Sequence, residues 1–394
     1  MPNKPITQFN HCSSKKLAHR IPIRLLVLGV ATGFAYLFIG LLVYFYPIHA
    51  QEPPPDPDSV SENLRLEEYA CRARDPESFK ACLVEARQTG VPFIRIDAPI
   101  ICESRADCEF NMSNMKYFLK IAPAAPENKF IRTSDFGYTL FNIQNSGQIE
   151  LASLTFEDES DTGCPQGTTC PPLISISMAT NIKFDKVTFN KTQNTSVKIA
   201  DSRGIEIYNS LFKDSYRSAI EISTANFTDG LRIENNTFEN NAGAALIFQS
   251  NSLSSQSLVQ NNKFINNHSN GAYADCTYPC TGAQIKINGP TSNLRIAKNS
   301  ITGGINTALD SLGLYASGIE IAGQNIKSTS LYCNEITANR GSGIVQAPPY
   351  ANITAVTISE NKLTGNGLNL NIPTVPADDT NCYTAECTLA CLNR

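Results

Sequence analysis

The sequence is poor in the residues that build zinc centres and nucleic-acid surfaces. Its 394 residues include no tryptophan and only four histidines, and His268 is the one histidine beyond residue 50. Its 13 cysteines never form a Cys-x-x-Cys pair, the spacing of tight zinc sites. Basic residues do not outnumber acidic ones, since 32 Lys and Arg accompany 36 Asp and Glu. These shortages argue against a zinc domain and against the basic footprint of a nucleic-acid-binding protein.

The first 50 residues contain no acidic side chain. They carry five basic residues, all placed before the uncharged stretch Leu25–Phe45. This stretch of 21 residues is long enough to cross a bilayer as a helix, and the preceding charges keep residues 1–24 in the cytoplasm. We predict a membrane segment at residues 25–46 that places the rest of the chain in the periplasm or outside the cell. Ile48-His49-Ala50 resembles a cleavage site, so a retained signal anchor and a cleaved, secreted form both stay open.

Twelve of the cysteines follow this segment, and most of them come as close neighbours. An even number in near pairs is typical of disulfide bonds in an oxidising compartment. We expect disulfides rather than zinc binding, with the neighbours Cys71 and Cys82, Cys102 and Cys108, Cys164 and Cys170, Cys276 and Cys280, and a tail group of Cys333, Cys382, Cys387 and Cys391.

The charge of the exported part bounds its partners. The formal net charge of −4 becomes −9 once the five basic residues before Ala50 are set aside. We therefore expect no nucleic acid partner and no direct attraction to anionic lipid headgroups, so that the N-terminal segment alone provides membrane contact. The sequence does not indicate an oligomeric state.

Two short regions precede the main domain. Residues 51–61 are proline-rich and predict an extended linker. Residues 62–90 predict a pair of helices, the first running from Glu62 to Arg72. Asp75 and Pro76 are typical of the start of the second, and Gly90 marks its end. Because a solenoid needs its open end covered, we expect this pair to be an N-terminal helical cap.

From Val91 onward the apolar pattern changes to a period of two, and a repeat appears. Its copies read GIEIYNSLF, GLRIENNTF, SLVQNNKF, NLRIAKNSI, TSLYCNEI and AVTISENKL. They close on an apolar residue, at Phe212, Phe238, Phe264, Ile301, Ile336 and Leu363. Two positions earlier stands a polar residue, at Ser210, Asn236, Asn262, Asn299, Asn334 and Asn361. Short strands at this spacing leave no room for intervening helices, which favours an all-β solenoid.

This pattern is explained by a backbone that makes one coil per repeat. Successive coils stack at about 4.8 Å, the spacing of strands in a sheet, so residues at the same place lie above one another. We expect the asparagines to adopt the left-handed conformation of tight corners and to hydrogen-bond along the stack. The closing apolar residues should form one interior column.

A second strand follows each corner, in SAIEIS, AALIFQ, AQIKIN, SGIEIA and SGIVQ. Alternation places Ile220 with Ile222, Leu246 with Phe248, Ile285 with Ile287, and Ile319 with Ile321 in the interior. The intervening residues Glu221, Ile247, Lys286 and Glu320 should point outward.

The coil motif I-x-x-N-x-[FIL] followed by [AG]-[IL]-x-I resembles that of the pectate-lyase-like superfamily of right-handed parallel β-helices. The resemblance covers Val91 to Leu370, most of the exported chain. It implies a β-helix over residues 91–371, closed by a cysteine-rich tail or cap at residues 372–394. Members of this superfamily that act on sugars use the outward face of one sheet, so a polysaccharide is the expected partner.

The candidate site lies where two coils carry insertions between corner and second strand, at residues 266–281 and 302–317. For the lyase or epimerase reaction that the resemblance implies, the candidate catalytic residues are Lys286, Arg217, His268 and Asp275. The candidate substrate-binding residues are Asp214, Tyr216, Glu221, Tyr273, Tyr278, Asp310, Tyr315 and Glu320. Tyrosine rings would stack on sugars, and charged groups would bind hydroxyls or carboxylates. The alternative is structural, since Lys198 beside Glu221 and Lys286 beside Glu320 fit ordinary cross-strand pairing.

The sequence lacks the signature motifs of the best-known activities of the superfamily. The sequence has no Gly-His-Gly, no Asp-Pro-His-Asp and no Arg-x-Pro-x-x-Arg, and its one Asp-Asp pair, Asp378 and Asp379, lies in the tail. We therefore expect a polysaccharide-binding or polysaccharide-handling protein of the cell envelope. The alternative is a lyase or epimerase acting on an acidic glycan. Such an enzyme needs a base, and positive charge or calcium to stabilise its intermediate, so calcium is a possible cofactor.

Overall fold

The computed structural model describes most of the chain beyond Ala70. The described residues are 70–133, 137–159, 170–223, 228–249, 256–267, 283–304, 316–322, 326–347, 353–372, 380–384 and 391. The predicted membrane segment and linker lie outside them. Within them, no helix has both the length and the apolar character needed to cross a membrane.

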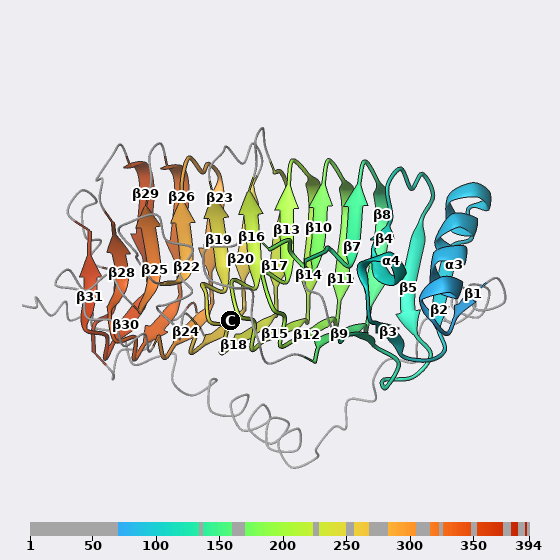
Figure 1. Ribbon diagram of the computed structural model, residues 1–394. Coiled ribbons are helices and arrows are strands. Elements are labelled where there is room, and N and C mark those ends of the chain that lie inside the picture. The colour runs from blue at the N-terminus through green and yellow to red at the C-terminus, as the bar shows by residue number, and fades with distance from the viewer. Residues whose placement is uncertain are drawn as a thin grey trace, which may run out of the picture. The chain divides into compact units, whose positions relative to one another are not determined.

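The described strands form three parallel sheets, called A, B and C here, that run along the length of the molecule (Figure 1). Sheet A has 11 strands, which are β1 (Cys71–Ala73), β2 (Phe93–Ile96), β5 (Leu119–Pro123), β8 (Gly147–Ala152), β11 (Thr180–Asp185), β14 (Arg203–Tyr208), β17 (Arg232–Glu234), β20 (Ser257–Gln260), β23 (Leu294–Ala297), β26 (Ile326–Tyr332) and β29 (Ile353–Ser359). Every third strand of the chain thus returns to the same sheet, which is the topology of a parallel β-helix.

Sheets B and C have ten strands each among the described residues. Sheet B contains β3 (Ile100–Cys102), β6 (Phe130–Arg132), β9 (Thr155–Asp158), β12 (Thr188–Asn190), β15 (Leu211–Lys213), β18 (Thr237–Glu239), β21 (Lys263–Ile265), β24 (Ser300–Thr302), β27 (Glu335–Thr337) and β30 (Lys362–Thr364). Sheet C contains β4 (Phe110–Asn111), β7 (Phe141–Gln144), β10 (Ile174–Ser177), β13 (Val197–Ala200), β16 (Ile220–Ser223), β19 (Leu246–Gln249), β22 (Ala283–Asn288), β25 (Ser317–Ala322), β28 (Ser342–Gln346) and β31 (Leu368–Asn371). One coil therefore runs from sheet A to B to C.

The predicted interior column is confirmed. Phe238 pairs with Phe264 and Phe264 with Ile301 in the register of sheet B. The rings of Phe238 and Phe264 are stacked with centroids 4.8 Å apart. The column continues through Phe212, Phe189 and Phe156 in the earlier coils, with centroid distances of 5.0, 4.7 and 5.2 Å. The predicted inward residues of sheet C, such as Ile220 and Ile285, are also fully buried.

The asparagines at the corner between sheets A and B form the predicted ladder. The side-chain amide of Asn262 donates to Oδ1 of Asn299 at 3.0 Å and to the carbonyl of Ile233 at 2.8 Å. The backbone N–H of Asn262 donates to the same Oδ1 at 2.9 Å. The pattern repeats from Asn236 through Asn361 and ends on Asn381 of the tail. Each buried amide is satisfied, which such a corner requires.

The left-handed residue of this corner was predicted one position too late. The residues with positive φ are those before the ladder asparagines, namely Asn235, Asn261, Lys298, Cys333 and Glu360. The ladder position itself faces the interior, because its side chain must reach the next coil. The preceding residue makes the turn, and lysine, cysteine and glutamate occupy it as well as asparagine.

The predicted helical pair can be checked only from Ala70 onward, since residues 62–69 lie outside the described residues. The second helix is confirmed as α3 (Pro76–Thr89), with Asp75 as N-cap and Gly90 in the left-handed conformation after its end. The first was predicted to run to Arg72, but Cys71–Ala73 is strand β1, hydrogen-bonded to β2 in sheet A. Sheet A therefore begins 20 residues before the predicted boundary at Val91. Alternation over three residues, with Ala73 fully buried, prevails there over the helical pattern.

Helix α3 lies at one end of the stack, opposite β31 (Figure 1). Its Phe79 is fully buried and its ring contacts those of Phe110, Phe130 and Phe141, with centroids 4.6 to 5.7 Å apart. The side chain thus covers the first aromatic layer of the core. A second, four-residue helix, α4 (Arg105–Cys108), follows β3.

Two of the predicted disulfides between close neighbours are confirmed, and a third joins two members of the predicted tail group. Cys71 is bonded to Cys82, Cys102 to Cys108, and Cys333 to Cys391. Cys170 and Cys382 are also disulfide-bonded. Cys164, Cys276, Cys280 and Cys387 lie outside the described residues. The Cys333–Cys391 disulfide fastens the tail to the last coils. A parallel β-bridge between the backbones of Lys362 and Cys382 does the same.

Candidate functional site

The outward face of sheet C carries one column of side chains that crosses nine strands. From β7 to β31 it consists of Asn142, Ser175, Lys198, Glu221, Ile247, Lys286, Glu320, Val345 and Asn371. The middle of the column holds all the predicted outward residues. Alternation along each strand, with apolar neighbours buried on both sides, sets this orientation.

Two ion pairs lie in this column. Nζ of Lys198 is 2.7 Å from Oε1 of Glu221, and Nζ of Lys286 is 3.7 Å from Oε1 of Glu320. Ile247 separates the pairs and is 5% exposed. Glu320 is completely buried although it points away from the core. Its carboxylate therefore needs the Lys286 ammonium, because an uncompensated buried charge is costly.

A hollow of about 280 Å³ opens beside the first ion pair. It is lined by Cys170, Pro172, Asn194, Thr195, Lys198, Arg217, Glu221 and Gln249. Arg217 comes from the turn between β15 and β16, and Lys198 and Glu221 come from β13 and β16. The hollow thus combines two cationic side chains, one carboxylate and two amides, a set that suits sugar hydroxyls and a sugar carboxylate.

The turn that presents Arg217 rests on a buried cluster of hydroxyl groups. Oγ1 of Thr192 lies 2.7 Å from Oγ of Ser196 and 2.8 Å from Oγ of Ser215. The backbone N–H of Ser215 donates to Oδ1 of Asn241 at 3.1 Å, which begins a second amide ladder through Asn267 and Gln284. The sequence interpretation missed this ladder, although the Asn-Asn spacing of NNTFENN signals it. These hydrogen bonds tie the backbone of the turn to the coils on both sides of it.

The other predicted residues of this turn lie beside Arg217. Asp214 is exposed and has φ of 56°, so it makes the corner after β15. Tyr216 is half-buried, and its N–H donates to the carbonyl of Thr192 at 2.8 Å. The structure thus brings Arg217 and Glu221 to one hollow and puts Asp214 and Tyr216 on the turn at its edge.

Lys286 and Glu320 lie further along the same column. The remaining predicted residues, His268, Tyr273, Asp275, Tyr278, Asp310 and Tyr315, fall outside the described residues. Within the described ranges no group of three or more His, Cys, Asp or Glu side chains is arranged to hold a metal ion. The side chains that the described part of the site offers to a ligand are hydrogen-bonding and charged groups.

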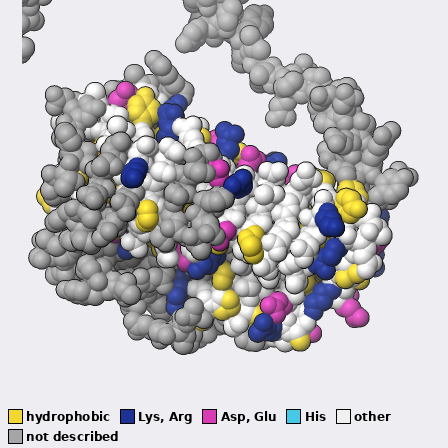
Figure 2. Space-filling model, turned by 90° about the horizontal axis from the view of Figure 1, so that it is seen from above, with side chains coloured by type: hydrophobic (Ala, Val, Ile, Leu, Met, Phe, Trp, Pro, Cys, Tyr) yellow, Lys and Arg dark blue, Asp and Glu magenta, His cyan; other side chains and the backbone are white. Residues whose placement is uncertain are grey.

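The outward face of sheet A carries charged residues that the sequence interpretation did not single out. Lys120, Glu150, Lys183, Glu206 and Arg232 follow one another in register on successive strands. Beside them, burial raises the pKa of Tyr208, and the negative charge of Glu206 raises it further. The sequence signal for such an outward residue is its position between two inward apolar residues, as for Glu206 in GIEIY and Arg232 in GLRIE. Figure 2 shows basic and acidic side chains together on one face, with neither sign filling it.

Comparisons with known proteins concern the fold. Among solved structures, the periplasmic alginate epimerase AlgG is 13% identical, with a TM-score of 0.40 over 74% of this chain and 76% of that one. Tailspike protein 3 of bacteriophage CBA120 is 12% identical, with a TM-score of 0.43 over 85% and 56%. The DFA-IIIase from Arthrobacter chlorophenolicus A6 is 11% identical, with a TM-score of 0.42 over 79% and 93%. No curated protein matches the sequence.

The family comparison agrees with the topology. Residues 172–363 match the family model described as the right handed beta helix region. This range runs from just before β10 into β30 and includes every lining residue of the hollow beside Arg217 except Cys170. With three parallel sheets and stacked like residues, the described part of the chain is a parallel β-helix, and its residues 172–363 match the model of the right handed beta helix region.

Proposed function

We propose that this protein binds polysaccharide outside the cytoplasm, on the outward face of sheet C. The observation that carries the proposal is the hollow lined by Lys198, Arg217 and Glu221. Its polar groups come from successive coils about 4.8 Å apart, a repeat that suits the extended chain of a polymer. Its two cations would recognise a carboxylate or several hydroxyl groups of a sugar.

Two features support the extracytoplasmic location. The uncharged stretch Leu25–Phe45 follows a basic tail, which is the pattern of an export segment. The disulfides at Cys71, Cys102 and Cys333 join neighbouring parts of the fold and would persist in an oxidising compartment. The envelope is therefore the proposed site of action.

A binding assay on the full chain in detergent tests the proposal. Polygalacturonate, alginate and glycosaminoglycan oligosaccharides would be titrated against the protein and its Arg217→Ala variant. We expect the variant to bind about tenfold more weakly, since a hydrogen bond to a charged group contributes about 1.5–3 kcal/mol. Arg232→Ala is the matched control, because Arg232 lies on sheet A with its Nε 3.0 Å from Oε1 of Glu234. No binding of any glycan, or equal weakening by both variants, would contradict the proposal.

The same incubations distinguish binding from catalysis. A lyase would produce new double bonds that absorb ultraviolet light. A calcium-dependent rise in absorbance that disappears in Lys286→Ala would favour the lyase alternative over simple binding. A constant absorbance together with binding supports the proposed function.

A further inference from the structure

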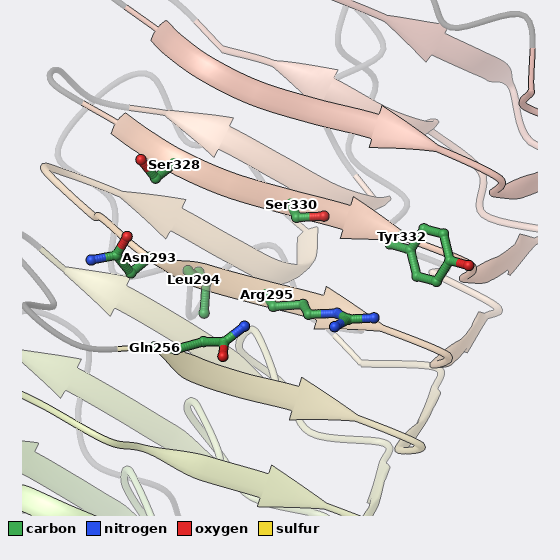
Figure 3. A pocket seen from close by; sticks show the side chains of 7 residues that line it. All are labelled: Gln256, Asn293, Leu294, Arg295, Ser328, Ser330 and Tyr332. Carbon is green, nitrogen blue, oxygen red and sulfur yellow. The ribbon is translucent and has the colours of Figure 1, made fainter.

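A second hollow lies on sheet A, at the C-terminal end of the stack. Its volume is about 460 Å³, within the range of small-ligand sites. Its lining consists of Gln256, Asn293, Leu294, Arg295, Ser328, Ser330 and Tyr332. Figure 3 shows these side chains on neighbouring strands, with the Arg295 guanidinium extended along β23 toward the end at which Tyr332 lies.

Arg295 differs from the other arginine of its column, Arg232, in having no acidic partner within the described part of the chain. It occupies the outward position of β23, between Leu258 and Ser330 in the register of the sheet. Its guanidinium carbon lies 5.4 Å from the centroid of the Tyr332 ring. Among the described residues no carboxylate forms an ion pair with it, whereas Nε of Arg232 lies 3.0 Å from Oε1 of Glu234. Arg295 is half-buried, so its charge faces the hollow with reduced hydration.

The groups around Arg295 supply neutral hydrogen-bonding partners. The hydroxyls of Ser328 and Ser330 make no hydrogen bond to the described part of the chain. Tyr332 donates its hydroxyl proton to Oε2 of Glu360 at 3.3 Å, and the aromatic ring holds the guanidinium in place. One positioned guanidinium with hydroxyls and amides beside it suits a ligand that has one anionic group and several hydroxyls.

We propose that this hollow is a second binding site, for an acidic saccharide whose anionic group pairs with Arg295. Hydroxyls of the sugar bind Ser330, Ser328 and the amide of Gln256. The site lies on a different sheet from the hollow beside Arg217 and uses none of its residues. Its chemistry fits a carboxylate or a sulfate ester equally, since both present oxygens that a guanidinium binds in pairs.

Titration calorimetry on the full chain in detergent tests this site in an Arg217→Ala background, which removes the contribution of sheet C. The probes are a galacturonic acid oligosaccharide, a sulfated heparin oligosaccharide and neutral dextran. We expect Arg295→Ala to weaken binding of at least one acidic probe about tenfold, and Arg295→Lys to weaken it less, because charge remains but the fork is lost. The acidic probe that responds identifies the anion.

The controls separate this proposal from that for sheet C. Arg232→Ala, two strands away in the same column, should leave the affinity unchanged. Unchanged binding in both Arg295 variants overturns the second site, and so does dextran binding as tightly as the acidic probes. If Arg295→Ala weakens binding in a protein where Arg217→Ala had no effect, the second site stands and the sheet C proposal fails.

Discussion

The two halves of sheet A present opposite kinds of surface on the same scaffold. From β5 to β17 the outward column reads Lys120, Glu150, Lys183, Glu206 and Arg232, with charges that alternate in sign. From β20 to β29 it reads Leu258, Arg295, Ser330 and Thr357, with a single charge. In the first half neighbouring charges neutralise one another: Oε1 of Glu150 lies 3.4 Å from Nζ of Lys120 and 3.8 Å from Nζ of Lys183. In the second half the one cation faces a hollow.

This difference teaches where function should be sought on a β-helix. An alternating ladder offers no net field to a charged ligand, and its half-exposed pairs add little to stability. Arg295 has no ion pair with a carboxylate among the described residues, so its guanidinium remains available to a ligand. Removing a charge of the alternating ladder should therefore change stability only slightly and leave binding unchanged, whereas removing Arg295 should weaken binding.

The largest expected effect belongs to the buried pair Arg132–Asp158 of the N-terminal coils. The pair is bidentate, with distances of 2.8 and 2.6 Å, and both side chains are at most 1% exposed. The Asp158 carboxylate also accepts the N–H of Gln193 at 2.8 Å. Arg132→Met should lower the free energy of unfolding by about 3–5 kcal/mol, since it leaves a buried carboxylate uncompensated. Urea unfolding of Arg132→Met beside Lys120→Met checks this, and equal losses in the two variants would contradict it.

The next largest loss of unfolding free energy is expected in the asparagine ladder at the corner between sheets A and B. Its residues also differ between the earlier and the later coils. The coil at Ser210 has a hydroxyl at this place, while later coils have asparagine. Asn299→Ser, which copies the earlier coil, should cost about 1–3 kcal/mol, because the carbonyl of Val259 loses its side-chain donor and Oδ1 of Asn334 keeps only the backbone N–H of residue 299. Urea unfolding measures it, with the exposed Asn288→Ser as control. A loss no larger than that of the control would show that water replaces the ladder.

A smaller effect is expected at the start of α3. The N–H and hydroxyl of Ser78 hold the pKa of Asp75 below its usual 3.8. Asp75→Ala should cost about 1 kcal/mol near neutral pH. Because the folded pKa is the lower one, this contribution is complete above the unfolded pKa and is lost as pH falls through the folded pKa. Thermal unfolding of both proteins between pH 7 and 2 should show the difference shrinking below pH 4, and a constant difference would refute the charge-dependent cap.

The smallest effect is expected in the alternating ladder. Lys183→Ala should change the free energy of unfolding by less than about 1 kcal/mol, because the pair with Glu150 is half-exposed and screened. Adding salt should reduce even that difference. Thermal unfolding at low and high salt measures it. A loss as large as that of Arg132→Met would remove the distinction between the two kinds of charge.

The interior of the fold was predictable and the surface was only partly so. The repeat specifies the column of Phe238, Phe264 and Ile301, because residues at equal places in each coil must stack. The same logic gave the Asn262–Asn299 ladder and the outward direction of Glu221 and Lys286. It could not distinguish the ladder residue from the turn residue before it, since asparagine occupies both places at Asn235 and Asn236.

The sequence could not show which side chains of neighbouring coils contact each outward residue. The sequence shows Glu234 two residues after Arg232 and Ala297 two residues after Arg295, but it does not show that Tyr332 of the next coil lies 5.4 Å from the Arg295 guanidinium carbon. The burial of Glu320 was also unforeseen, because outward direction and exposure coincide only where nothing covers the sheet. Strand β1 was mistaken for helix because Cys71–Ala73 is too short for its alternation to stand out.

Photo-crosslinking tests the central claim, that polysaccharide binds the outward face of sheet C, most directly. The full chain in detergent would be irradiated with a diazirine-bearing oligogalacturonate, digested and sequenced by mass spectrometry. The account predicts crosslinks to the peptides that contain Lys198, Arg217 and Glu221, reduced by excess unlabelled glycan and by Arg217→Ala. Crosslinks confined to the outward side of sheet B, around Lys213 and Glu239, would contradict it.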